Sequence, residues 1–280
     1  MKKTVVLGLV LASVLLSFNV HAVEKYVFGV HPFESPTKLN VMFTPLMNYL
    51  SEQLGAKVEF RSAKDYDTAL ENLVNGTVHF SFLGPSPFAI LDEQYPGKIR
   101  IAAAVVNKGG SPTFQGVIVV KDDSPIKTLA DLKGKRFAFG DRDSTLSCYV
   151  PAYMLMQEGV FDSMVYEFVG SHNNVAKGIL NGTFAAGGLQ PNVAKEYEGK
   201  GLRVIATSEP VYEHVVVIGP SVDQATADKV RQALLNVKDP QVYTSIKPSL
   251  VGFTTVQASD YDGLKTIMRE VDAKIPKKKK

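Results

Sequence analysis

Apolar positions along the chain alternate between strand-like runs and segments with helical spacing. From residue 26 onward, short apolar runs are followed by amphipathic stretches, and several of these stretches end at glycine. Such alternation predicts a parallel-type sheet with helices on both faces. The expected strands of the first half are 26–30, 58–61, 79–83, 101–106 and 116–121, and the expected helices are 39–54, 66–75 and 128–135.

The pattern breaks once and then restarts. A Gly-Gly-Ser-Pro sequence at 109–112 interrupts the alternation, and a second α/β unit follows, with strands expected at 136–139, 166–169, 183–186 and 202–207. After 215–218 the chain is expected to be mostly helical, at 222–235, 240–246 and 261–275. We therefore predict two α/β lobes, one from 23–112 plus 215–280 and the other from 113–214. A ligand would lie in the cleft between them, at the strand ends.

The N-terminus is typical of an exported protein. Lys2 and Lys3 precede an apolar run at 5–18, and Val-His-Ala at 20–22 provides a plausible cleavage site. We expect a signal peptide over 1–22 and a mature periplasmic chain that starts at Val23. No cysteine adjoins the cleavage site, which argues against a lipid anchor, and no second apolar run of that length follows.

The formal net charge of +3 comes from the ends of the chain. Without Lys2, Lys3 and the four lysines at 277–280 it becomes −3, which argues against a nucleic-acid partner. The lysine run is expected to be a solvated end; contact with an anionic surface is the alternative. The single cysteine, Cys148, cannot form an internal disulfide, and we expect it to be a small packed residue.

Candidate chemistry concentrates in the sequence FAFGDRDSTLSCYVPAYML at 137–155. An apolar strand-like run is broken at 140–143, and the hydroxyls of Ser144, Thr145 and Ser147 come where a helix is expected to begin. A helix start offers free N–H groups and the positive end of the helix dipole, which favour an oxyanion. Serine and threonine are also ordinary helix caps, so these residues alone leave both a binding and a capping role open.

A wider set of residues resembles a known family. The segment SPIKTLADLKGKRFAFGDRDSTLS, followed by Pro151 and Leu155, resembles the phosphate, phosphite and phosphonate binding proteins of ABC transporters. The D-L-x-G-K part is common to many binding proteins, but together with S-T-x-S it is fairly specific. Further marks lie across nearly the whole mature chain: Asp65-Tyr66, Gly84-Pro85-Ser86, Ser111-Pro112 and Gly170-Ser171-His172.

The resemblance implies a type II periplasmic binding fold, with two lobes that are each a mixed sheet flanked by helices. It implies that Ser144, Thr145 and Ser147 hold the oxygens of a phosphorus oxyanion and that His172 adds a donor. Tyr66 and Ser86 are then the contributions of the first lobe. Neutral hydroxyls and amides can satisfy a buried anion without a matching buried cation. From the residues alone, Tyr66 could equally pack and His172 could equally cap a helix.

The chain also departs from the family pattern. Relatives that take aminoalkylphosphonates use two acidic residues for the ammonium group, whereas the matching neighbourhoods here read Gly-Leu-Gln-Pro-Asn at 188–192 and Tyr-Glu-His at 212–214, with only Glu213 acidic. A compact ligand such as phosphate, phosphite or methylphosphonate is therefore expected. Cys148 replaces a usual glycine, and Arg142 stands where proline is common and could strengthen the anion field.

The resemblance implies a monomer that delivers its ligand to an inner-membrane ABC permease without a cofactor. An alternative is a receptor of the same fold for a sulfonate or organic anion, or one that serves a sensor kinase. An enzyme with Ser144 or Ser147 as nucleophile and His172 as base is disfavoured, because the chain has no G-x-S-x-G turn and no orienting acid beside the histidine. The scattered histidines show no metal-ligand spacing, so we expect no metal site.

Overall fold

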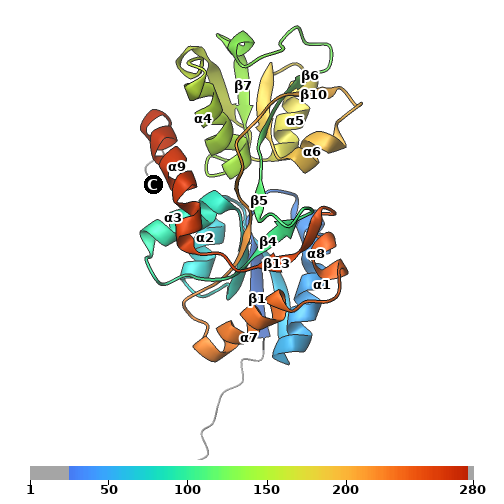
Figure 1. Cartoon of the computed structure of the whole chain (residues 1–280), viewed down its shortest axis with the longest axis vertical. Coiled ribbons are helices and arrows are strands. Elements are labelled where there is room, and N and C mark those ends of the chain that lie inside the picture. The colour runs from blue at the N-terminus through green and yellow to red at the C-terminus, as the bar shows by residue number, and fades with distance from the viewer. Residues whose placement is uncertain (1–24, 277–280) are drawn as a thin grey trace, which may run out of the picture.

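The computed structural model describes residues 25–276 of the chain. The expected signal peptide and the lysine run at the C-terminus lie outside this range. Within it, the strands form a six-stranded sheet, a five-stranded sheet and a two-stranded ribbon. Figure 1 shows the two larger sheets in separate lobes, one above the other, with the ribbon strand β5 between them.

The six-stranded sheet has the strand order β13-β4-β12-β3-β1-β2. Its strands are β1 (Lys25–Val30), β2 (Lys57–Ser62), β3 (Phe80–Leu83), β4 (Arg100–Asn107), β12 (Val215–Ile218) and β13 (Leu250–Thr254). The helices of this lobe are α1 (Pro36–Leu54), α2 (Tyr66–Val74), α3 (Pro85–Gln94), α7 (Gln224–Leu235) and α8 (Gln241–Thr244). The pairing of β1 with β2 and β3 is parallel, as alternation predicts, but β12 enters between β3 and β4 antiparallel to both.

The five-stranded sheet has the order β10-β6-β9-β7-β8. Its strands are β6 (Val117–Lys121), β7 (Arg136–Phe139), β8 (Val165–Phe168), β9 (Ala186–Leu189) and β10 (Leu202–Thr207). Its helices are α4 (Val150–Gln157), α5 (His172–Leu180) and α6 (Pro191–Glu196). Short helical turns occur at η1 (Ala130–Leu132), η2 (Thr145–Tyr149) and η3 (Phe161–Ser163).

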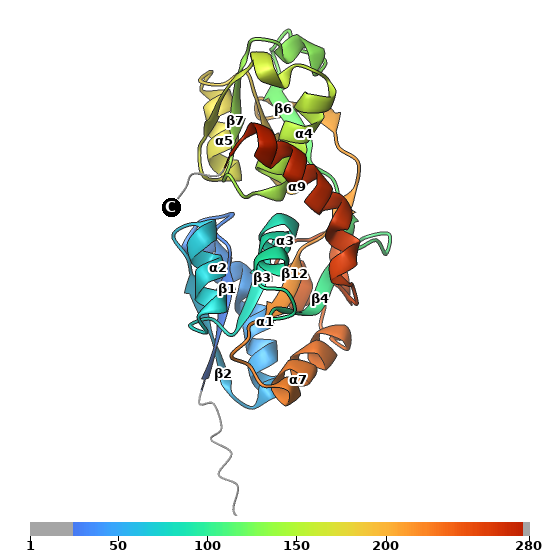
Figure 2. The same cartoon turned by 90° about the vertical axis from the view of Figure 1, so that its left-hand side faces the viewer.

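The chain crosses between the lobes through the ribbon of β5 (Thr113–Phe114) and β11 (Val211–Tyr212), which pair antiparallel. The division into lobes expected from the sequence remains a prediction. The strands of the six-stranded sheet lie within 23–112 and 215–280, and those of the five-stranded sheet lie within 113–214. The turn η4 (Ala258–Tyr261) leads into α9 (Asp262–Lys274), which packs against α3 of one lobe and α4 of the other. Figure 2 shows α9 running along one side of the molecule past both lobes.

Local signals explain several element ends. Ser35 caps α1 by accepting a hydrogen bond from the Lys38 N–H, and Pro36 occupies its first turn. The helix ends at Gly55, whose φ of 65° is the left-handed conformation that glycine adopts without strain. The sequence alone therefore locates such helices well.

Two expectations about local structure are wrong, and a third is incomplete. The segment expected as a strand at 183–186 forms β9 at Ala186–Leu189, because the glycines there allow close packing against Val175 and Pro151. The helix expected at 128–135 is only the short turn η1. The last part of the chain contains β13 as well as helices, since pairing with β4 gives that segment a partner that local pattern does not reveal.

In the described part of the chain, none of the helices combines the length and the apolar character that a membrane span requires.

Candidate ligand-binding site

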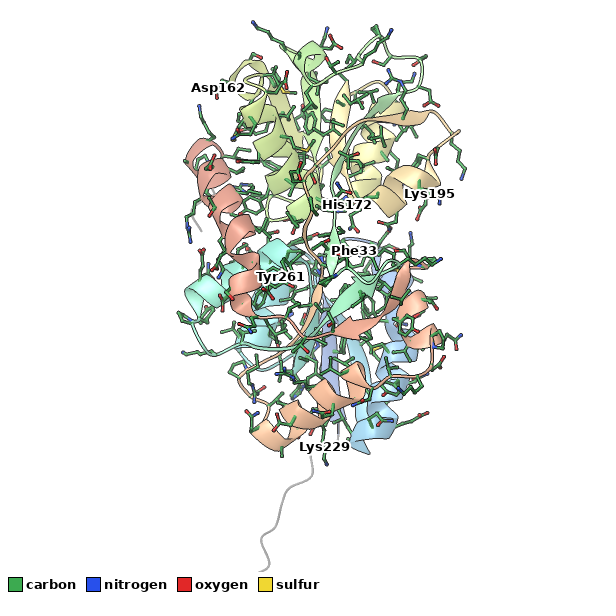
Figure 3. All side chains as sticks on the ribbon, viewed as in Figure 1. Phe33, Asp162, His172, Lys195, Lys229 and Tyr261 are labelled. Atoms are coloured by element: carbon green, nitrogen blue, oxygen red, sulfur yellow. The ribbon has the colours of Figure 1, made fainter. Side chains whose placement is uncertain are left out.

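A small cavity, with about 10 Å³ of space for the centre of a water-sized sphere, lies between the two lobes. Both lobes contribute to its wall, and no lysine or arginine is among the described residues that line it. Figure 3 labels His172 at the lower edge of the upper lobe, with Phe33 of the other lobe below it. The lining residues are His31, Tyr66, Gly84, Pro87, Phe114, Ser144, Thr145, Leu146, His172, Gln190 and His214.

One wall of the cavity is the start of a helix. Ser144 is the N-cap of η2, and its hydroxyl accepts a hydrogen bond from the Ser147 N–H at 3.3 Å. The wide π turn of η2 continues directly into α4, so the N–H groups of Thr145 and Leu146 stand at the open end of a helix that reaches Gln157. This end carries the positive pole of the helix dipole, and it faces the cavity with donors suited to an anion.

Thr145 also joins the two lobes. Its hydroxyl oxygen accepts a hydrogen bond from the Ser86 N–H at 2.9 Å and lies 2.8 Å from the Ser86 hydroxyl. The Ser86 hydroxyl donates in turn to the backbone oxygen of Asp143 at 2.6 Å. Ser86, at the start of α3, therefore does not line the cavity but fastens the donor turn to the opposite lobe.

Ser147 lies behind the turn. Its side chain is fully buried, and its hydroxyl has no hydrogen-bond partner among the described residues. The hydroxyl packs instead against Gly140, where a Cβ atom would come within 2.9 Å of the Ser147 Cβ and closer to its oxygen. The structure thus brings Ser144 and Thr145 to the cavity but not the side chain of Ser147.

Tyr66 reaches the cavity from the other lobe as the first residue of α2. The ring is buried, and its hydroxyl is hydrogen-bonded to the side chain of Ser144. Burial and the nearby carboxylate of Asp141 raise the pKa of the Tyr66 phenol, so the phenol keeps its proton. A phenol in this position can donate to a ligand or to Ser144.

His172 opens α5 rather than preceding it, and Ser171 is the N-cap. Its Nδ1 accepts a hydrogen bond from the Gln190 backbone N–H at 3.2 Å, so the neutral ring carries its proton on Nε2. The Gln190 side-chain amide lies 3.2 Å from that Nε2, and its oxygen is the end that can accept the proton. Burial and the neighbouring His214 lower the pKa of His172 to about 3, so its ring is a neutral donor.

Arg142 does not face the cavity. Its guanidinium binds Asp272 at 2.5 Å and the backbone oxygen of Ile275 at the end of α9, and it lies 4.9 Å from the ring centre of Tyr149. The expectation that Arg142 strengthens the field on the anion is therefore not supported by its placement. Cys148 is buried beside it, and burial raises the pKa of the thiol to about 12.

Among the cavity residues that were not identified from the sequence are two histidines, His31 and His214. His31 follows β1, and its Nδ1 lies 3.1 Å from the backbone oxygen of Phe82. His214 precedes β12, and its Nδ1 lies 2.7 Å from the carboxylate of Glu213. The only available signals were a histidine at the carboxyl end of a strand and an adjacent Glu-His pair, and neither shows that the two rings meet.

Glu213 itself points away from the cavity. It is fully buried and accepts hydrogen bonds from Asn107 at 2.9 Å and from Lys247 and His214. Burial alone would raise its pKa, but the His214 hydrogen bond and the charge of Lys247 hold the pKa of Glu213 well below its usual range. The carboxylate is therefore ionised and committed to its neighbours.

The described residues hold no group of three or more histidine, cysteine or acidic side chains that could bind a metal ion. No hydrogen bond joins His172 to Ser144 or Ser147 within this range, so the suggested nucleophile and base do not meet. The arrangement can hold a small anion with neutral donors, and it places histidines at the opposite wall.

The chain is similar to known substrate-binding proteins. Residues 28–261 match the family described as the periplasmic substrate-binding protein of phosphonate ABC transporters. The chain is 30% identical over 174 residues to the phosphate-import protein PhnD of Mycolicibacterium smegmatis, an alignment that covers 59% of this chain and 54% of that protein. It is 29% identical over 175 residues to a probable phosphite-binding protein, PhnD1, of Prochlorococcus marinus, covering 59% and 58%. The chain thus spans somewhat more than half the length of these two relatives.

Solved structures show the same fold. PhnD1 of Prochlorococcus marinus in complex with methylphosphonate has a TM-score of 0.80 at 19% identity, covering 89% of this chain and 98% of that one. A binding protein component of a phosphonate ABC transporter from Pseudomonas aeruginosa has a TM-score of 0.76 at 18% identity, covering 89% and 86%. The two-lobe architecture is therefore that of periplasmic binding proteins. Together with the match over most of its length, this shows that the chain belongs to the family of periplasmic substrate-binding proteins of phosphonate ABC transporters.

Proposed function

We propose that the protein captures a small phosphorus oxyanion between its lobes and presents it to an ABC permease in the inner membrane. The observation that carries this proposal is the helix start at Ser144 and Thr145, which faces a small cavity lined from the opposite lobe by Tyr66 and His31. Neutral donors at a helix start can hold an anion away from water without a buried cation. Delivery to a permease and residence in the periplasm follow from membership of the family.

The cavity supports a compact ligand such as phosphate, phosphite or methylphosphonate. The two positions at which an ammonium group would need an acid hold Gln190, whose amide is engaged by His172, and Glu213, which is committed to Lys247 and His214. The cavity has about 10 Å³ of space for the centre of a water-sized sphere, enough for about one water molecule. The engagement of Gln190 and Glu213 disfavours an aminoalkyl chain.

Calorimetry on the mature protein tests the proposal. The protein is unfolded and refolded to remove carried-over ligand and is then titrated with phosphate, phosphite, methylphosphonate, 2-aminoethylphosphonate, sulfate and taurine. We expect micromolar or tighter binding of one compact phosphorus oxyanion and weaker binding of 2-aminoethylphosphonate. Absence of binding to all the phosphorus compounds would contradict the proposal. Binding of taurine or sulfate instead would favour a receptor for another anion.

Two single substitutions test the donor turn. Thr145→Ala is expected to weaken binding by about 1–3 kcal/mol, because it leaves the buried Ser86 N–H without its acceptor and breaks the contact that joins the lobes beside the cavity. Ser147→Ala is expected to have a smaller effect, because the Ser147 hydroxyl faces Gly140. Thr145→Ser keeps the hydroxyl and serves as the matched control. If Thr145→Ala binds as well as wild type, the turn acts only as a helix cap.

A further inference from the structure

The wall opposite the donor turn contains two stacked imidazole rings. His31 is 2% exposed and His214 is 7% exposed. Their ring centres are 5.5 Å apart with an angle of 27° between the planes. The ring of Tyr66 meets His31 edge-on at 4.9 Å, and Phe82 stacks on His214 at 4.9 Å. The rings are therefore held in fixed orientations by aromatic packing.

The partners behind the two rings determine which nitrogen carries the proton. Nδ1 of His31 faces the Phe82 carbonyl oxygen at 3.1 Å, and a carbonyl can only accept. Nδ1 of His214 faces the ionised carboxylate of Glu213 at 2.7 Å, which likewise can only accept. Both Nδ1 atoms must therefore donate. In the neutral rings, Nε2 is then a bare acceptor in both histidines.

Both Nε2 atoms point to the same place on the cavity wall. A Cβ atom built on Gly84, which lines the cavity, would lie 3.4 Å from Nε2 of His31 and 3.6 Å from Nε2 of His214. No donor to either Nε2 is recorded among residues 25–276. The cavity thus combines the donor turn at Ser144 and Thr145 with two acceptors on the opposite wall, where Tyr66 adjoins His31.

The groups around His31 oppose a positive charge on its ring. His31 faces His214 and, at longer range, His172, and each of these rings opposes a positive charge on it. Burial, followed by His214, lowers the pKa of His31 to about 3. The charge of Glu213 behind His214 is shared with Lys247, and the phenol of Tyr66 stays protonated.

Building on the proposed function, we propose that the neutral rings of His31 and His214 share, through their Nε2 atoms, one hydrogen bond donated by the P–OH group of the bound ligand, so that the site selects phosphorus oxyanions in their protonated form. Nε2 lone pairs would repel an oxygen that carries no proton, but they accept a hydrogen bond from a P–OH group. Sulfate and alkanesulfonates have no such proton at neutral pH. A buried site that must pair with a hydroxyl rejects analogues without one, because its polar groups are left unsatisfied.

The pH dependence of wild-type binding provides a test that needs no substitution. The apparent Kd for phosphate, phosphite and methylphosphonate should be constant below the second pKa of each ligand. Above it, the Kd should rise about tenfold per pH unit, as the competent fraction of ligand falls. The break should move with the second pKa of each ligand, measured in the same buffers. A Kd that is independent of pH, or a break at one pH for all three ligands, would overturn the proposal.

Anion selectivity provides the second arm. At a pH where phosphate is mainly the monoanion, sulfate should bind more than about a hundredfold more weakly. In His214→Gln the side-chain amide can donate into the cavity, and we expect the preference for phosphate over sulfate to fall by about tenfold or more. His79→Gln is the matched control, because His79 lies outside the cavity lining and accepts from the Val27 N–H. Thermal unfolding checks that both variants are folded.

The outcomes separate the two proposals. Tight phosphate binding with equal sulfate binding would overturn the selection of a protonated ligand and leave the receptor function intact. Absence of binding to any phosphorus oxyanion would overturn both. If His214→Gln does not fold, the pH series and the comparison of sulfate with phosphate in wild type still test whether the site selects a protonated ligand.

Discussion

Glu213 is a residue that the sequence singles out but that affects the site only indirectly in the structure. In the sequence it is the only acid in the two neighbourhoods where related binding proteins hold an ammonium group. In the structure its carboxylate is fully buried and shared by Asn107, Lys247 and His214. Its effect on a ligand passes through the orientation of the His214 ring. Removing one partner of such a pair leaves an uncompensated charge, which is more costly than the pair itself is stabilising.

We expect Glu213→Gln to lower the free energy of unfolding by about 3 kcal/mol at neutral pH, the lower part of the range for a broken buried pair, since the Lys247 side chain keeps some exposure. The folded pKa of Glu213 is depressed, so its stabilisation is fully present above the ordinary carboxylate pKa and is lost as the pH falls through the folded pKa. Urea unfolding at a series of pH values should show a flatter acid limb in the variant than in wild type.

Glu59→Gln is the control for that measurement. Glu59 is also paired with lysines, Lys25 and Lys57, and its pKa is also lowered, but its titrating group is fully exposed. Solvent screening makes such surface pairs weak, so this variant should unfold like wild type. An equal decrease in the free energy of unfolding in Glu213→Gln and Glu59→Gln would show that the buried Glu213 pairs stabilise the protein no more than surface pairs do.

The helix start illustrates the element scale. The turn after β7 must place Ser144 and Thr145 at the cavity while the π turn of η2 packs against the strand end. The Gly140 N–H donates to the backbone oxygen of Ser147 at 3.1 Å, and the backbone oxygen of Gly140 accepts from the Gly170 N–H at 3.1 Å. Gly140 therefore sets how closely η2 approaches β7, because it has no side chain at the point of contact.

Gly140→Ala is expected to lower the free energy of unfolding by about 1–3 kcal/mol and to weaken ligand binding. The added Cβ would meet the Ser147 side chain at 2.9 Å or less, and overpacked sites relax by moving backbone. That movement would carry Ser144 and Thr145 with it. Denaturant unfolding and calorimetry measure the two effects.

Gly263→Ala in α9 is the matched control, since no atom lies within 4 Å of the Cβ position there. Alanine has the higher helix propensity, so this variant should be as stable as wild type or more stable by up to about 1 kcal/mol. Wild-type binding by Gly140→Ala would mean that the turn does not depend on this close approach.

The whole molecule is in a closed arrangement in which one hydrogen-bonded cluster joins the lobes beside the cavity. Ser86 of one lobe bonds both the Thr145 hydroxyl and the Asp143 backbone oxygen of the other. The same hydroxyl of Thr145 lines the cavity, so ligand binding and closure share an atom. The two substitutions Ser86→Ala and Thr145→Ala should therefore not be additive.

We expect Ser86→Ala to raise the Kd of the ligand although Ser86 does not line the cavity. The double variant with Thr145→Ala should depart from additivity by about 0.5–3 kcal/mol. Small-angle scattering should show compaction of wild type at ligand saturation and less compaction of Ser86→Ala. Ser245→Ala, which removes another buried hydroxyl at a residue that does not line the cavity, is the control. Additive effects, or no compaction of wild type, would contradict closure through this cluster.

The sequence allowed the fold class and the helix start to be predicted because both depend on neighbours in the chain. Ser144 and Thr145 stand where a strand run ends and a helix pattern begins, and capping chemistry acts over a few residues. The sequence did not show that the Ser147 side chain turns away from the cavity, because the direction of this side chain depends on the π turn and on Gly140. Strand β13 was not predicted, because it is stabilised by pairing with β4, which is distant in the sequence.

The sequence by itself therefore determined two α/β lobes, the donor turn and the family. Tertiary structure alone decided what faces that turn. His31 and His214 are separated by more than half of the chain, and they meet because β12 returns to pair beside β3. Their protonation depends on the Phe82 carbonyl and on the Glu213 carboxylate behind them. Donors arise from local backbone geometry, whereas acceptors of fixed tautomer require partners that only the folded chain brings together.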